Sequence, residues 1–406
     1  MRSGKGMAAA GVRTRAPRVP ADRRREDIVS TAAELFAARG YTGTGIDDIG
    51  ATIGISGPAI YRHFAGKDAV LARIGVRFLD GLHSTAEEAV GECLAVDSFG
   101  RMVDATVAYT LAHSPDLTVC LRHLWHLHGT ALDELLDRWH AVVELWTRAA
   151  TLARVPIAPE DAPLYLRAAC GVALGASRSE EGVDPARVLD LVRLTVARVL
   201  DTPVPEGRAT ASAEPVGAGR RWIRSSRREQ ILTTAIGLFR ERGFRGVAMA
   251  EIAEALGLTA GAPYRHFKSK EDILATAIER TGLRVALGMD DALANATSAQ
   301  DAVDRMLHAY VDVCVENGDL VAISLSEYHH VPQIHERRRA RQRVFFEEWT
   351  HCLAQIRPEL TTAEARLVVR LMTGLVTESV RSRRLSRRPH LADDLYRLAQ
   401  SVVAGR

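Results

Sequence analysis

Residues 56–64 of the chain read S-G-P-A-I-Y-R-H-F, and residues 259–267 read T-A-G-A-P-Y-R-H-F. Each copy follows a short amphipathic segment and a glycine, Gly54 or Gly257. Two helices joined by a glycine turn, with Ser or Thr starting the second, are typical of a helix-turn-helix, whose second helix enters the major groove of DNA. The sequence therefore predicts two DNA-reading segments on one chain.

The composition is that of an ordinary globular protein. Of the 406 residues, 47% are hydrophobic and 25% are charged, and the formal net charge is +3. Any nucleic-acid surface therefore has to come from local arginine clusters. The five cysteines show no CxxC spacing, which argues against a disulfide framework and a structural zinc site. No signal-peptide core or membrane-spanning apolar run is present, so we expect a cytoplasmic protein.

The two copies belong to a longer internal repeat. The shift that carries Tyr61 onto Tyr264 also aligns residues far outside these segments. Aligned in this way are Phe36 with Phe239, Gly40 with Gly243, Lys67 with Lys270, Asp116 with Asp319, His126 with His329, Trp146 with Trp349, and Gly171 with Gly374. The duplication therefore covers whole units without a net insertion.

Helical periodicity extends through both halves with little strand signal, so the predicted fold is all-α. A stretch rich in Pro, Gly, Ala and Ser separates the halves and predicts a linker. The predicted segments are a disordered basic arm (1–22), a helix-turn-helix head (23–70), a helical body (71–200), the linker (201–224), a second head (225–273) and a second body (274–406). The arm is either a tail without function or a source of phosphate and minor-groove contacts.

Small residues gather in the helix expected from about Asp161 to Arg178. Small side chains let a neighbouring helix approach closely. The residues concerned are Ala168, Ala169, Gly171, Ala173, Gly175 and Ala176. We therefore expect a helix–helix interface there.

The two heads differ at positions that shape their helices. Thr44 and Asp47 have the spacing of a capping box, in which a side chain closes the first turn of a helix. Val247 and Ala250 stand at the corresponding positions of the second head, and loss of an N-cap typically costs ~1 kcal/mol. Pro263 also lies inside the second reading helix. We therefore expect the second head to read a different sequence or to bind more weakly.

Further motifs surround both reading segments. The first copy contains L-F-A-A-R-G-Y (35–41), T-G-I-D-D-I-G-A-T-I-G-I-S (44–56), Y-R-H-F (61–64) and Lys67. The second contains L-F-R-E-R-G-F (238–244), E-I-A-E-A-L-G-L-T (251–259), Y-R-H-F (264–267) and Lys270. On these motifs the chain resembles the TetR/AcrR family of bacterial transcriptional regulators. They cover the head of each half.

The resemblance implies that each half is a helix-turn-helix head on a ligand-binding and dimerisation body. It also implies DNA contacts at the matching positions, with Arg62 and Arg265 either contacting phosphates or lying on a solvated face. The implied contacts are Thr44, Ser56, Gly57, Tyr61, Arg62, His63 and Lys67 in the first head, and Thr259, Ala260, Tyr264, Arg265, His266 and Lys270 in the second.

Aromatic and methionine residues at helical spacing suit either a ligand pocket or a plain core. Our pocket candidates are Met102, Tyr109, Trp125, His126 and Trp146 in the first body, and Met306, Tyr310, Tyr328, His329 and Phe345 in the second. An arginine run within residues 337–343 is either a solvated helix face or a cluster for the phosphates of an acyl-CoA. Residues 324–380 are also similar to family members that respond to lipid, steroid or CoA-linked ligands.

The spacing of the histidines in the first half does not favour a metal site. His123, His126 and His128 do not share one helix face, and only His126 is repeated, as His329. We interpret them as packing or surface residues and predict neither a metal nor a cofactor.

The predicted function is that of a cytoplasmic, nucleoid-associated repressor that leaves double-stranded operator DNA when a small apolar ligand binds. The two halves could pair with each other as a single-chain pseudo-dimer, or two chains could form a homodimer. Two alternatives stay open. One is a ligand-sensing interaction protein with one or both heads vestigial. The other is a helical enzyme, although no phosphate loop, nucleophile elbow or HExxH motif is present.

Overall fold

A computed structural model describes residues 20–91, 98–177, 182–205 and 226–404 of the chain. All regular structure within these ranges is helical, which confirms the predicted all-α fold. The first half contains α1 (Ala21–Arg39), α2 (Ile46–Thr52), α3 (Gly57–Ile60), α4 (Lys67–Val90), α5 (Ser98–Ala112), α6 (Ser114–Arg122), the 3₁₀ helix η1 (Leu124–His126), α7 (Thr130–Leu152), α8 (Ala162–Ala176) and α9 (Pro185–Asp201).

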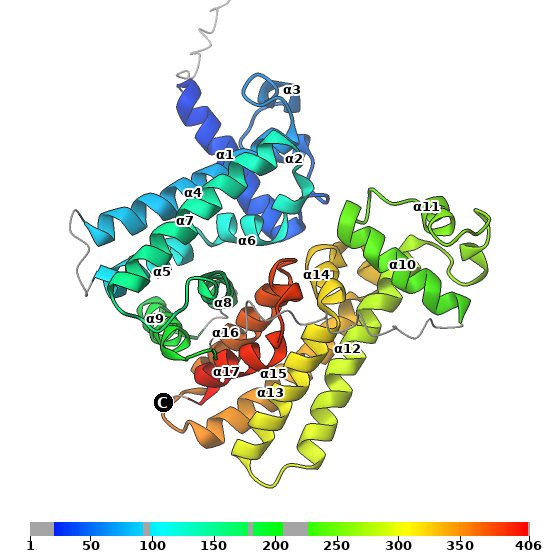
Figure 1. The fold of residues 1–406 in the computed structure, drawn as a ribbon. Coiled ribbons are helices and arrows are strands. Elements are labelled where there is room, and N and C mark those ends of the chain that lie inside the picture. The colour runs from blue at the N-terminus through cyan, green and yellow to red at the C-terminus, as the bar shows by residue number, and fades with distance from the viewer. Residues whose placement is uncertain (1–19, 92–97, 178–181, 206–225, 405–406) are drawn as a thin grey trace, which may run out of the picture.

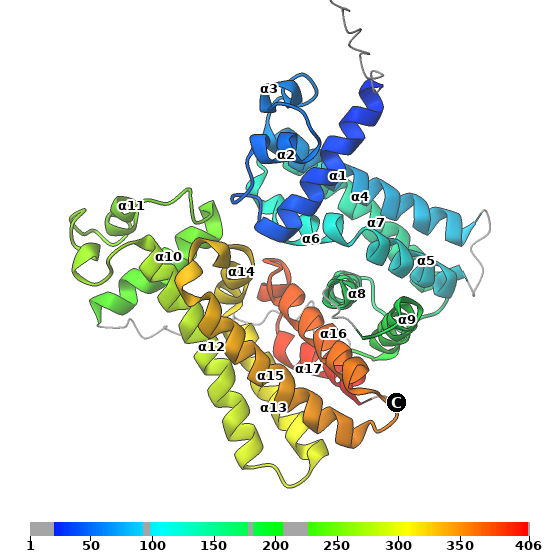
Figure 2. The same ribbon diagram turned by 180° about the vertical axis from the view of Figure 1, so that it is seen from behind.

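The second half repeats this order with more 3₁₀ helices. It contains α10 (Arg227–Arg242), α11 (Met249–Glu254), η2 (Pro263–Arg265), α12 (Lys270–Ala294), α13 (Ala299–Glu316), α14 (Gly318–Ser326), η3 (Tyr328–His330), η4 (Pro332–Ile334), α15 (His335–Ile356), α16 (Thr362–Val380), η5 (Leu385–Arg387) and α17 (Leu391–Val403). Figures 1 and 2 show the first half, blue to green, beside the second, light green to red. No helix within the described ranges is long and apolar enough to cross a membrane.

The expected arm and linker lie mostly outside the described residues. Of the arm predicted for residues 1–22, the structure describes residues 20–22. Helix α1 begins at Ala21, so its first two residues lie within the predicted arm. Of the linker predicted for residues 201–224, the structure describes 201–205.

The first helix of each head ends at a glycine whose backbone is left-handed. Gly40 has φ 79° and Gly243 has φ 76°, and each donates its N–H to the helix carbonyl four residues back. A left-handed residue after the last turn is a common helix stop, and glycine adopts it without a Cβ penalty. The two heads therefore turn from first to second helix in the same way.

The two halves meet where α8 crosses α16. Gly171 and Gly374 face each other so closely that a Cβ on Gly171 would lie 2.5 Å from the Gly374 carbonyl oxygen. Gly175 likewise approaches the backbone of Arg370. The helix–helix interface predicted from the small residues is thereby confirmed, and its partner is the matching helix of the other half.

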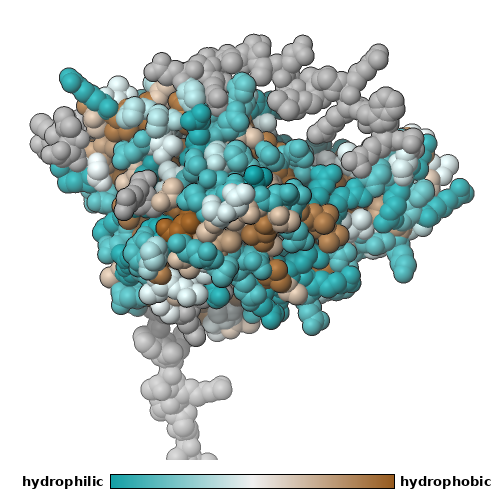
Figure 3. Space-filling model, turned by 90° about the horizontal axis from the view of Figure 1, so that it is seen from below, coloured by the Kyte–Doolittle hydropathy of each residue, from teal (hydrophilic) through white to brown (hydrophobic). Residues whose placement is uncertain are grey.

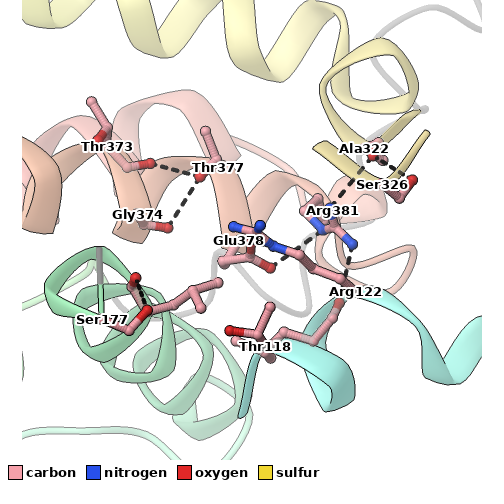
Figure 4. A network of polar contacts seen from close by, with 12 residues as sticks. Thr118, Arg122, Ser177, Ala322, Ser326, Thr373, Gly374, Thr377, Glu378 and Arg381 are labelled. Atoms are coloured by element: carbon pink, nitrogen blue, oxygen red, sulfur yellow. Dashed lines mark hydrogen bonds and ion pairs between the residues drawn. The ribbon is translucent and has the colours of Figure 1, made fainter. Parts of the chain in front are cut away.

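A buried ionic network lies beside this crossing (Figure 4). Glu378 on α16 has 0% exposure and is flanked by three arginines. Its carboxylate lies 3.3 Å from Arg381 Nε, 3.7 Å from Arg122 Nε and 3.8 Å from Arg167 Nη2. Arg122 and Arg167 belong to the first half, so the network joins the two halves through charge as well as through packing.

The hydrophobic core is divided unequally. One continuous cluster runs through the first head, the first body and the second body. The second head has a cluster of its own, which reaches the second body through Ile323, Val331 and Ile334. Seen from below, the surface is mostly hydrophilic, with hydrophobic patches gathered across its middle (Figure 3). The first head is therefore built into the rest of the molecule more deeply than the second.

Candidate nucleic-acid interface and ligand cavity

The first reading segment presents an exposed polar edge over a buried base. Ile60 and Phe64 are buried in the head. Tyr61, between them in sequence, is 58% exposed, and Arg62 is also exposed. α3 is only four residues long and continues as hydrogen-bonded turns to Phe64. Tyr61 and Arg62 are therefore accessible from solvent, as the predicted DNA contacts require.

The other residues expected at this edge are divided between surface and interior. Ser56 is exposed and makes no side-chain cap hydrogen bond, whereas His63 is half-buried. Gly57 is buried, and a Cβ there would overlap the carboxylate of Asp47. A larger residue at position 57 would therefore require the exposed Asp47 side chain to move aside.

Thr44 does not lie where the sequence predicted. It is 1% exposed, and its hydroxyl donates to the carbonyl oxygens of Gly40 at 3.0 Å and Leu35 at 3.3 Å. Because that hydroxyl is used inside the head, the predicted DNA contact at Thr44 is wrong. The predicted capping pair is wrong as well, because α2 is capped at Gly45, whose N–H donates to Asp48 Oδ2 at 2.6 Å.

The second head keeps this cap although its sequence suggested a loss. The Ala248 N–H donates to Glu251 Oε2 at 2.7 Å, which reproduces the Gly45–Asp48 arrangement. Val247 is buried at the position of Thr44. The expectation that substitutions at Thr44 and Asp47 remove the cap is therefore wrong, since neither residue forms it in the first head.

The second reading segment has the same exposed edge on a tighter backbone. Tyr264 is 56% exposed, and Thr259, Ala260 and Arg265 are exposed, while His266 is half-buried. Its regular part is the three-residue 3₁₀ helix η2, which begins at the buried Pro263. The aromatic edge is thus presented twice, on a short α-helix in the first head and on a 3₁₀ helix in the second.

The two aligned lysines lie at the base of their heads. Lys67 Nζ is 4.1 Å from the centre of the Tyr41 ring, and burial together with the charge of Arg245 lowers the pKa of Lys67 to about 8. Lys270 Nζ donates to the carbonyl oxygens of Phe244 at 2.9 Å and Val247 at 3.0 Å. Lys270 therefore holds the turn before α11, and both ammonium groups are half-buried.

An arginine joins each head to its body. Arg77 on α4 pairs with Glu26 of α1 and, at 2.5 Å, with Asp116 of α6. Its counterpart Arg280 on α12 donates to both oxygens of Glu229, at 2.6 and 2.7 Å. In both halves the long helix that follows the head thus carries the link between the body and the first helix of the head.

A large cavity opens in the second body. Its volume is about 1020 Å³, and α12, α13, α15 and α16 supply most of its wall. The apolar part of the wall includes Ile278, Val285, Met289, Tyr310, Val321, Phe345 and Phe346. The charged part includes Arg338, Arg339, Arg341, Arg343, Arg366 and Arg370. The first half completes the wall with Arg122, Leu174 and Gly175.

The pocket candidates from the sequence are scattered rather than gathered. Tyr310 and Phe345 line the large cavity, whereas Tyr328 and His329 line a neighbouring polar cavity of about 230 Å³. Met306 is buried outside both lining sets. In the first body, Met102 and Trp146 are core residues, Tyr109 donates to the Phe78 carbonyl, and the His126 ring lies tilted against Tyr41. The side chain of Trp125 lies outside the described residues.

Several wall residues were absent from the prediction. Arg366 and Arg370 are one helical turn apart on α16, and this spacing on an otherwise apolar helix was a usable signal. Arg122 reaches the cavity from the other half, which no local sequence pattern indicates.

Comparison with known proteins identifies the two heads. The family described as "Bacterial regulatory proteins, tetR family" matches residues 28–74 and 231–277. The HTH-type transcriptional activator FasR of Mycolicibacterium smegmatis is 36% identical over 81 residues, which are 20% of this chain and 37% of that protein. The HTH-type transcriptional repressor KstR2 of Rhodococcus jostii is 43% identical over 51 residues, 13% of this chain and 25% of that protein.

Among solved structures, the ketosteroid transcriptional regulator KstR2 of Mycobacterium tuberculosis aligns at 23% identity with a TM-score of 0.41, covering 45% of this chain and 95% of that chain. The matches to FasR and to the Rhodococcus jostii KstR2 cover 37% and 25% of those proteins, so the chain spans well under half of the length of either relative.

Proposed function

Because the chain belongs to the TetR family and carries two of its units in tandem, we propose that it is a DNA-binding transcriptional regulator. In this proposal it is a repressor whose heads occupy operator DNA and leave it when a ligand fills the cavity of the second body. The carrying observation is the repeated exposed edge, with Tyr61 and Arg62 in the first head and Tyr264 and Arg265 in the second.

The cavity supports a ligand that is apolar at one end and anionic at the other. Its wall combines aromatic and aliphatic side chains with six arginines of the second half, and Arg122 adds a seventh from the first. Guanidinium groups bind carboxylates and phosphates with two parallel hydrogen bonds. A fatty acid, a steroid acid or an acyl-CoA fits this description, and the arginine-rich wall favours the acyl-CoA.

The wall also supports a route from ligand to DNA. Arg122 and Glu378 line the cavity and belong to the buried network between the halves. On the second half, Ile278 of the wall lies on the same helix as Arg280, which pairs with Glu229 of the head. A ligand that prefers one position of these helices by about 1–3 kcal/mol would change DNA affinity about 5–150-fold.

We further propose that the two halves form one regulatory pseudo-dimer. The backbone contact between α8 and α16 and the buried Glu378 network are the supporting contacts. Because the reading segments differ in sequence and backbone, the operator is expected to have two unequal half-sites. Light scattering on the full chain tests the pairing, and a stable dimer of chains would contradict a simple monomeric pseudo-dimer.

The DNA function is tested by selecting duplexes from a random pool with the full chain. The expected product is an enriched site with two dissimilar halves, whose affinity falls linearly with salt on a logarithmic scale. An enriched perfect palindrome would contradict the unequal half-sites. Failure to enrich any sequence would contradict the proposed regulator.

The ligand is tested on the same protein with an acyl-CoA and the free fatty acid of equal chain length. Tighter binding of the acyl-CoA, lost in an R341M/R370M variant, is expected. The matched control is R73M, because Arg73 is exposed on α4 and does not line the cavity. If R341M/R370M and wild type bound each ligand equally well, the proposal that these arginines bind the anionic part of the ligand would be contradicted.

A second candidate is a ligand-sensing interaction protein that reads DNA with one head. The observation that favours it is the reduction of the second reading segment to the 3₁₀ helix η2. In that case the selection would return one half-site of fixed sequence, and substitution of Tyr264 would leave the selected sequence unchanged.

A further inference from the structure

Three side chains converge between α14 and α15. Glu327, His329 and His330 each offer a ligand atom, and all these atoms lie within 4.8 Å of one another. His330 Nε2 is 3.3 Å from Glu327 Oε2. Glu327 is 1% exposed, and among the described residues its Oε2 has no hydrogen-bond partner. A buried carboxylate is stabilised by a positive charge beside it, and a metal ion held between Glu327 and the two imidazoles would supply one.

Both heads take part in shaping this cluster. The Thr42 hydroxyl of the first head lies 2.9 Å from His329 Nε2 and 3.0 Å from His330 Nε2, so both imidazoles point at one spot. The His330 ring stacks on Phe244 of the second head, with ring centres 4.8 Å apart. The His329 ring rests against Gly40, where a Cβ would lie 2.8 Å from it.

The donor set matches a transition-metal site. Two imidazoles and one carboxylate form a recurrent zinc ligand set, in which a fourth position is left for water or another ligand. The charge of Arg245 near His329 opposes a cation, and the Glu327 carboxylate offsets it.

We propose that Glu327, His329 and His330 bind one Zn²⁺ ion at the junction of the two heads, with the Thr42 hydroxyl beside the open coordination position. All three ligands belong to the second body, so the ion would reach the first head through the Thr42 hydroxyl, which lies within hydrogen-bond distance of both imidazoles. The site occurs once per chain, because the aligned positions of Glu327 and His330 in the first half are Leu124 and Leu127.

The test is metal titration of the full chain after treatment with a chelator. Wild type is expected to bind one equivalent of Zn²⁺, and Co²⁺ at the same site should show the visible absorption of a four-coordinate ion. E327Q, which keeps the shape of the side chain, should weaken binding by at least about tenfold. H351Q is the control, because His351 is exposed and distant in sequence from the cluster.

Two further readouts guard against a folding artefact. Circular dichroism of E327Q should match wild type, and an H329N/H330N variant should lose the Co²⁺ absorption. Amide exchange in residues 40–45 should slow when Zn²⁺ is added to wild type. Unchanged Zn²⁺ affinity in both variants, or no binding by wild type, would overturn the site, and unchanged exchange would overturn the tie between head and body.

Discussion

The two heads have closely similar backbone paths in different surroundings. Each has a first helix ended by a left-handed glycine, a short capped second helix and an exposed tyrosine on the reading segment. The core of the first head is continuous with both bodies, whereas the second head has a separate core. The two repeats therefore share the backbone path of the head but differ in how far the hydrophobic core of the head is continuous with the bodies.

The same holds at the junction of the halves. Glu378 of the second half aligns with Gly175 of the first, so the buried carboxylate that gathers three arginines is present on one side. The His330 ring stacks on Phe244 of the second head. In the first half, the ring that lies against the aligned Tyr41 is that of His126, the counterpart of His329, and it is tilted. Differences at single aligned positions thus give the two sides of the interface different polar contacts. Gly171 and Gly374, which are aligned, still allow the two helix backbones to approach closely.

The largest expected effect is on folding stability, when the buried Glu378 carboxylate at the junction of the halves is removed. E378A leaves Arg122, Arg167 and Arg381 without their shared carboxylate and should lower the free energy of unfolding by about 3–5 kcal/mol. Denaturant unfolding measures it. E88Q is the control, because Glu88 is exposed on α4. A loss below about 1 kcal/mol, the size of a surface ion pair, would show that the network does not hold the halves together.

The next effect separates the heads by DNA binding. Y61A should weaken binding to the selected operator about tenfold or more, which corresponds to about 1.4 kcal/mol. Y264A should weaken it by less, because the second reading segment is shorter and its head less firmly supported. Equal losses in both variants, measured by fluorescence anisotropy at one salt concentration, would mean that the two heads contribute alike.

A smaller effect tests the interior of the heads. T44V removes a buried hydroxyl that donates to Gly40 and Leu35, so it should destabilise the protein by about 1 kcal/mol. V247T, the reverse change at a buried position of the second head, should cost less than T44V, because its hydroxyl can donate to the carbonyl of Gly243, the residue aligned with Gly40. Urea unfolding of both variants checks this, and a larger cost for V247T would reverse the comparison.

The smallest effect is a pH dependence confined to the first head. The pKa of Lys67 is lowered to about 8, so between pH 7 and pH 9 the folded protein releases a proton that the unfolded chain retains. Folding stability should therefore rise slightly with pH across this window. Any DNA phosphate contact of Lys67 should weaken at the same time. K67R stays charged, and a pH profile shared by K67R and wild type would assign the change to another group.

Much of the fold could be predicted from the sequence because its signals are local. Helical periodicity, the glycine stops and the small residues of α8 each depend on nearby positions, and the structure agrees with them. The predicted capping pair Thr44 and Asp47 was wrong because the next two residues along, Gly45 and Asp48, have the same spacing and form the cap instead. The sequence does not show that the Thr44 side chain is buried and points away from the first turn of α2, where Asp48 accepts the hydrogen bond.

The sites were predicted less well because they depend on contacts across the chain. Tyr61 and Tyr264 are exposed, and their contact with DNA stays a prediction. Arg122 lines a cavity in the other half, and Thr42 meets His329 and His330 across the repeat. No spacing rule within one helix indicates such pairs, and the histidines therefore appeared unrelated.

The crossing of α8 and α16 bears on how pairing of the two halves depends on the concentration of the protein. When partner subunits are separate chains, the fraction that is paired falls as the protein is diluted. In the proposed pseudo-dimer the partners are covalently linked, so one would face the other at an effective concentration set by the linker rather than by expression level. A regulator built in this way would occupy its operator in direct proportion to the number of chains, even when a cell holds very few of them.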